Sequence, residues 1–204
     1  MTEAEFAPFA NFKTRWHNRG RSFVYEVTDY LSGAPDSVLF AYTDAVVAKS
    51  AGYRKEYGYE YHRWISSPEF IEENRPSYIA RSRNITRSPE GTHRSLYDSL
   101  DRLISSGFLD GSVLRDSYFT WTKRPGYTKV GSCNTVFRVV SVSSSLDSED
   151  VPEEVLDYVV YHECLHLSGG YRPGKRPHDR EFRMAEREFP YWKKAEKFLC
   201  DMKK

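Results

Sequence analysis

The chain has 204 residues, of which 30 are Lys or Arg and 29 are Asp or Glu, and its formal net charge is +1. A balance this even excludes the global electrostatic field that attracts nucleic acid, membranes or acidic substrates, so a charged partner has to be recognised locally. The length is enough to bury a hydrophobic core, and we expect one catalytic unit with an appendage.

The start of the chain is polar and without a clear hydrophobic period. Glu3 and Glu5 stand where a signal peptide needs basic residues, and no apolar run reaches the length of a membrane span. The three cysteines, Cys133, Cys164 and Cys200, form no CxxC pair, which favours free thiols in a reducing compartment. We therefore expect a cytoplasmic protein that does not contact membranes, with residues 1 to about 20 forming a loosely packed arm.

The next part of the chain has a helical pattern of apolar residues. These residues recur at spacings of three and four over residues 23–31, and the pattern stops at Ser32 and Gly33. A second helical pattern begins at Pro35 and ends near Gly52, so the two predict a helical hairpin. Together with a helix start at Ser67, this indicates that residues 1–94 form a helical N-terminal extension.

Residues 95–204 combine helical and strand patterns, which predicts an α+β fold. An apolar stripe predicts a helix from Ser95 to Gly107, and the period then changes to two. Strands are expected at residues 118–122 and 136–142, with a short strand near 130–133 between them. A helix follows over residues 151–169, and a last helical stretch begins near His178 and is interrupted at Pro190.

The helix predicted at 151–169 carries the segment His-Glu-Cys-Leu-His at residues 162–166. His162 and His166 are four residues apart and project from one helix face, with Glu163 beside them. Two imidazoles at this spacing can bind one Zn²⁺, and a nearby carboxylate can take a proton from water that zinc has made acidic. Because the surrounding helix is strongly apolar, burying these side chains is costly unless a metal or hydrogen bonds compensate. We therefore predict a zinc site with His162 and His166 as ligands and Glu163 as general base.

The third ligand can be sought in the residues that follow. The metzincin pattern would require a histidine where Arg172 stands, so this class is excluded. Two candidates are left. His178 stands at the expected start of the next helix, and Glu186 has the position of a thermolysin-type glutamate ligand within that helix. We favour His178 and keep Glu186 as the alternative.

An ordered series of motifs surrounds this segment. The motifs are Val130-Gly131-Ser132-Cys133, a strand ending in Ser143-Ser144-Ser145-Leu146-Asp147, the helix carrying His162, and His178-Asp179-Arg180-Glu181-Phe182. In this order they resemble the SprT-like and YgjP-type group of zinc metallopeptidases. The resemblance implies a minimal zincin fold over residues 95–204, with His162, His166 and His178 as ligands of one zinc ion and Glu163 as general base. Residues 1–94 lie outside it.

The resemblance also implies a peptide or unfolded protein as substrate. In such a fold an extended peptide adds to an open strand edge beside the metal, and the candidate edges are residues 136–142 and 131–133. Each can equally be a strand paired within its own hairpin. Two other functions stay open: a catalytically silent, zinc-stabilised binding or adaptor module, and a metal-dependent hydrolase of a non-peptide bond.

One segment has a local excess of positive charge. Between residues 75 and 94 five arginines stand against one acid, namely Arg75, Arg81, Arg83, Arg87 and Arg94. Such a segment can hold phosphate or single-stranded nucleic acid. The commoner interpretation is a solvated loop, so weak nucleic-acid contact is a secondary prediction, linked to the adaptor function.

Overall fold

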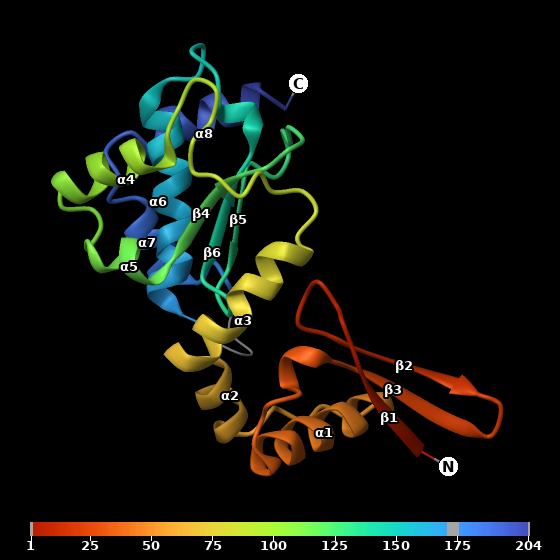
Figure 1. The fold of residues 1–204 in the computed structure, drawn as a ribbon. Coiled ribbons are helices and arrows are strands. Elements are labelled where there is room, and N and C mark those ends of the chain that lie inside the picture. Colours follow the sequence, from red (N-terminus) through yellow and green to blue (C-terminus); the bar gives the residue numbers. More distant parts are fainter. Residues whose placement is uncertain (1, 171–175, 204) are drawn as a thin grey trace. The chain divides into compact units, whose positions relative to one another are not determined.

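The computed structural model describes residues 2–170 and 176–203 (Figure 1). The chain divides into two compact units, Met1–Ser82 and Arg83–Lys204. Each combines helices with a three-stranded sheet, so the predicted α+β class is confirmed. Residues 83–94, which the sequence analysis grouped with the extension, belong to the second unit. There Ile85 forms an isolated bridge with Thr122.

The first unit begins with a sheet of strands β1 (Thr2–Ala7), β2 (Thr14–Arg19) and β3 (Ser22–Thr28). The strand order is β1-β3-β2, with β1 parallel and β2 antiparallel to the central strand β3. A 3-10 turn, η1 (Asp29–Leu31), leads into helices α1 (Asp36–Ser50), α2 (Tyr59–Ile65) and α3 (Pro68–Arg81). Helix α3 has the predicted start, because the Ser67 side chain accepts a hydrogen bond from the Phe70 N–H.

The helix predicted at residues 23–31 is wrong, and with it the helical hairpin. Residues 22–28 form β3, whose neighbours β1 and β2 come from the segment that was expected to be a loose arm. The physical reason is that Phe23, Tyr25 and Val27 are β-favouring residues, and a short apolar run satisfies either period. Hydrogen bonds to the two flanking strands, β1 and β2, stabilise residues 22–28 as a strand. The second predicted helix, now α1, is confirmed.

The second unit carries the remaining elements: α4 (Leu96–Ser105), α5 (Ser112–Asp116), β4 (Tyr118–Trp121), β5 (Gly131–Asn134), β6 (Val139–Val142), η2 (Ser144–Leu146), α6 (Glu153–Gly169), α7 (Arg180–Glu186) and α8 (Trp192–Asp201). Its sheet has the order β4-β6-β5, in which β6 is parallel to β4 and antiparallel to β5. The strand predicted at 136–142 begins only at Val139. Residues 135–138 form a turn, in which the Asn134 side chain accepts hydrogen bonds from the N–H groups of Val136 and Phe137.

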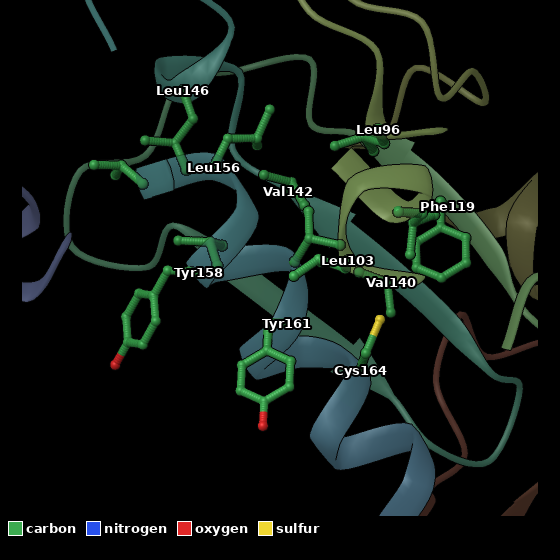
Figure 2. Close-up of a cluster of buried hydrophobic side chains, with 14 of the residues drawn as sticks. Leu96, Leu103, Phe119, Val140, Val142, Leu146, Leu156, Tyr158, Tyr161 and Cys164 are labelled. Carbon is green, nitrogen blue, oxygen red and sulfur yellow. The ribbon is translucent and has the colours of Figure 1, made fainter. Parts of the chain in front are cut away.

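Helix α6 is the centre of this unit, since it contacts α4, α7, α8 and strands β5 and β6. Figure 2 shows how its side chains Leu156 and Cys164 pack with Leu103 of α4 and with Val140 and Val142 of β6. Burial on several sides explains why the helix is apolar around most of its circumference. A polar group on such a helix needs a partner or a function.

Two carboxylates of the second unit are structural. Asp157 on α6 accepts hydrogen bonds from the Arg102 guanidinium and the Ser99 hydroxyl of α4. Asp147 accepts three successive backbone N–H bonds, from Thr92, His93 and Arg94. Asp147, the residue after η2, therefore fixes the loop before α4. Within the described residues, no helix is both long enough and apolar enough to cross a membrane.

Candidate metal centre

Three imidazoles converge where α6 meets the residues that precede α7. Helix geometry places His162 and His166 on one face of α6, one turn apart. The Nε2 atom of His178 lies 3.2 Å from Nε2 of His162 and 3.1 Å from Nε2 of His166. The structure thus brings together the three histidines predicted as ligands, close enough to bind one metal ion.

The lowered pKa values of two of these rings, His166 and His178, favour metal binding. Burial lowers the pKa of His166 to about 4, and the neighbouring His162 and His178 lower it further in the same direction. Burial likewise lowers the pKa of His178, with His162 as the next cause. Neutral imidazoles present lone pairs to one another, and a cation between them turns this repulsion into attraction.

Glu186, the alternative third ligand, lies on the other side of His162. Its Oε1 atom is 2.6 Å from Nδ1 of His162, the ring nitrogen that does not face His178. The Tyr158 hydroxyl donates to the same oxygen over 3.0 Å. The hydrogen bond to His162 is the main reason why the pKa of Glu186 lies below its usual range. His178 therefore completes the imidazole cluster. Glu186 contacts the cluster at Nδ1 of His162, the ring nitrogen that does not face His178.

The side chain of Glu163, the predicted general base, extends from α6 to Gly131 of strand β5. This side chain is buried, and burial raises its pKa to about 7, against the smaller opposing effects of His162 and Lys129. A Cβ atom added to Gly131 would lie 2.3 Å from Oε1 of Glu163. A side chain at position 131 would therefore force this carboxylate or the strand to shift.

The imidazoles and Glu163 line one cleft with a volume of about 1090 Å³. One wall is formed by β5, and another by Phe182 of α7, whose ring stacks on His166 at a centroid distance of 4.5 Å. Of the two predicted strand edges, residues 136–142 are wrong, because β6 is paired on both sides. Strand β5 is at an edge of the sheet, so residues 131–133 are the edge beside the imidazoles.

The predicted basic segment is divided between the two units. Arg75 and Arg81 belong to α3, and Arg83, Arg87 and Arg94 belong to the second unit. The Arg81 guanidinium forms a bidentate ion pair with Asp29, and Arg94 pairs with Glu153 and donates to the Val151 carbonyl. The Arg81 and Arg94 guanidinium groups therefore have structural partners inside their own units. Nucleic-acid contact stays a prediction.

Sequence reasoning missed what surrounds the imidazoles. Tyr158 and Tyr161 bind the last turn of α7, and Gly131 makes room for Glu163. The signal for the tyrosines was available, because residues 158, 161 and 162 share one helix face. The role of Gly131 depends on a contact between β5 and α6, which are distant in the sequence, so no local pattern predicts it.

No protein-family model, curated protein or solved structure gave a match to the chain.

Proposed function

We propose that the second unit is a zinc-dependent metallopeptidase with a minimal zincin fold, acting on a peptide or an unfolded protein. The observation that carries the proposal is the convergence of three imidazole nitrogens and one buried carboxylate in a single cleft. The order of elements, an edge strand followed by the metal helix and a later histidine, agrees with the resemblance to the SprT-like and YgjP-type group. A cytoplasmic location belongs to the same proposal.

The donor set suits zinc. Bonds of about 2.0–2.1 Å in a tetrahedral zinc site put two nitrogen ligands roughly 3.3 Å apart, close to the 3.1 and 3.2 Å between the Nε2 atoms here. Cys133 also lines the cleft, but burial raises the pKa of its thiol, which stays protonated and is a poor ligand. Three neutral nitrogens leave the fourth position of a tetrahedral ion open.

Glu163 is suited to move the proton. Zinc held by the three imidazoles supplies Lewis acidity, which polarises a carbonyl and makes water acidic near neutral pH. The Glu163 carboxylate, buried in the same cleft, would accept a proton from that water and later donate it to the amine nitrogen of the leaving group. The contact with Gly131 holds the Glu163 carboxylate at the boundary between α6 and β5.

Strand β5 offers a way to bind an extended substrate. It is an edge strand, it lines the cleft, and its residue Gly131 touches the catalytic carboxylate. A peptide that adds to this edge is held by main-chain hydrogen bonds, which do not depend on its side chains. Such binding suits unfolded protein segments.

The test uses the purified full-length chain, with zinc content measured by elemental analysis and hydrolysis measured on unfolded casein. We expect about one zinc per chain, and we expect Glu163→Gln to keep the metal and abolish hydrolysis. Glu181→Gln is the matched control, because Glu181 lines the same cleft on α7 and is exposed. Unchanged zinc content after His162→Ala with His166→Ala would refute the site. Metal binding without cleavage of any unfolded protein would refute the peptidase and favour the silent adaptor module.

A further inference from the structure

One face of α6 is hydrogen-bonded to the last turn of α7. The Tyr161 hydroxyl donates to the Ala185 carbonyl over 2.8 Å. At the next residue of α7, Oε1 of Glu186 lies 2.6 Å from Nδ1 of His162 and accepts from the Tyr158 hydroxyl over 3.0 Å. In Figure 2 both tyrosine hydroxyls point away from the apolar cluster, so these side chains connect the core of the unit to α7. His162 is the only one of the three that also belongs to the imidazole cluster.

The position of Glu186 is not explained by the stability of α7. Glu186 is the last residue of that helix, where the helix dipole disfavours negative charge. Its side chain is nevertheless only 15% exposed, although α7 has no fully buried residue. The hydrogen bonds to His162 and Tyr158 offset this unfavourable position. The carboxylate is therefore placed for its contact with His162.

We propose that Glu186 is a positioning residue for the metal ligand His162, and that Tyr158 holds Glu186 in place. The proposal rests on the metal site of the proposed function and adds a residue to it. A carboxylate only accepts, so Nδ1–H of His162 donates to Glu186, and Nε2, which faces His178, is the nitrogen left to bind a metal ion. The same bond fixes the ring rotation and makes Nε2 a stronger donor to a cation.

Tyr158 is suited to its part, because it stays a hydrogen-bond donor. Burial raises the pKa of its hydroxyl, and the negative charge of Glu186 raises it further. The hydroxyl also lies 3.4 Å from Oε1 of Glu196 on α8, but the 3.0 Å contact to Glu186 is the shorter one. Because the Tyr158 hydroxyl keeps its proton near neutral pH, it donates to the Glu186 carboxylate, which accepts.

The test is the zinc affinity of the full-length chain, measured by competition with a chromophoric chelator. We expect Glu186→Ala to weaken zinc binding by about 10- to 100-fold, as the loss of the partner of a ligating histidine does elsewhere. Glu186→Gln should lose less, since its amide oxygen can still accept from Nδ1–H, and Tyr158→Phe should also lose less. Glu181→Ala on the same helix is the control and should bind zinc as the wild type does. Glu181 has no contact with His162 among the interactions of the described residues.

A second readout separates positioning from folding. Imidazole nitrogen shifts in the metal-free protein should show His162 protonated at Nδ1 in the wild type and as a tautomer mixture in Glu186→Ala, while circular dichroism shows that the variant is folded. Equal zinc affinity of Glu186→Ala and wild type would overturn the proposal. A wild-type chain without zinc affinity would overturn the proposed function as well. A chain that binds zinc but cleaves no peptide overturns only the proposed activity, because hydrolysis does not enter this comparison.

Discussion

Glu163 and Gly131 are in contact, with the carboxylate lying where the side chain of any other residue at position 131 would begin. A Cβ atom there would be 2.3 Å from Oε1 and 2.9 Å from Cδ of Glu163. Both residues line the cleft that contains the imidazole cluster. The edge strand and the helix that carries the predicted base are thus fitted to each other at this point.

Gly131→Ala should impair hydrolysis without removing the metal. The added methyl group forces either the Glu163 carboxylate or strand β5 to move, and a displacement of about 1 Å in a catalytic site costs roughly 100-fold in rate. Zinc content should be unchanged, because the three histidines come from α6 and from the residues before α7. Casein hydrolysis and elemental analysis measure the two effects.

The control for this substitution is Gly111→Ala in the same unit, since nothing lies within 4 Å of a Cβ atom at Gly111. It should hydrolyse casein at the wild-type rate. Full activity of Gly131→Ala would show that the position of the Glu163 carboxylate is not important for the reaction.

The parts of the fold that could be predicted are those in which apolar residues recur with one dominant period over many residues. Helices α4 and α6 bury long apolar faces, so their patterns predict their type and approximate bounds. Strand β3 could not be recognised in the same way. Its seven residues fit both periods, and its hydrogen-bond partners are polar segments without a period of their own.

The residues of the site also differ in whether a local sequence pattern predicts them. His162, Glu163 and His166 are fixed by helix geometry, so spacing alone places them together. His178 was favoured over Glu186 because a loop can return it to α6, and the structure places it there. The contact of Glu186 with Nδ1 of His162 depends on how α7 packs against Tyr158 and Tyr161; their shared helix face can be read from the sequence, but that α7 packs on this face cannot.

Asp147→Asn should destabilise the second unit in a pH-dependent way. Burial alone would raise the pKa of Asp147, but the N–H groups of Thr92, His93 and Arg94 outweigh it and hold this pKa below the usual value. Since the folded-state pKa is depressed, the charge of Asp147 stabilises the fold above the unfolded-state pKa of about 3.9, and this contribution is lost as the pH falls further. We expect a loss of about 1–2 kcal/mol at pH 7 from weaker hydrogen bonds to the amide.

Urea unfolding at several pH values checks this. The difference between wild type and Asp147→Asn should narrow below about pH 4, where the wild-type carboxyl also becomes neutral. Asp150→Asn, at an exposed site nearby, serves as the control. A difference that stays constant with pH would mean that the charge of Asp147 does not contribute.

Asp157→Ala should destabilise the helix pair α4 and α6. The Asp157 carboxylate is 8% exposed and accepts from Nε and Nη2 of Arg102 over 2.9 and 2.7 Å. It also accepts from the Ser99 hydroxyl. The Arg102 side chain is 36% exposed and still has Glu153 at 3.9 Å, so losing the hydrogen bonds of Asp157 should cost about 1–3 kcal/mol. Chemical unfolding measures the loss, and Asp101→Ala on the exposed side of α4 should change little. An equal effect of the two substitutions would contradict a structural role for this ion pair.

Removal of the metal should stop hydrolysis and lower the thermal stability of the second unit. The Nε2 atom of His178 lies 3.2 Å from that of His162 and 3.1 Å from that of His166, an arrangement that favours a bound cation. Such a cation stabilises the fold by about 4 kcal/mol when free zinc exceeds its dissociation constant 1,000-fold. Chelation by EDTA should therefore lower the unfolding temperature, and zinc should restore both stability and hydrolysis. Magnesium should restore neither, because it prefers oxygen ligands. The His162→Ala, His166→Ala double variant provides the control, since its unfolding temperature should not respond to EDTA. Hydrolysis that survives complete removal of zinc would mean that Glu163 and the imidazoles do not act through a metal.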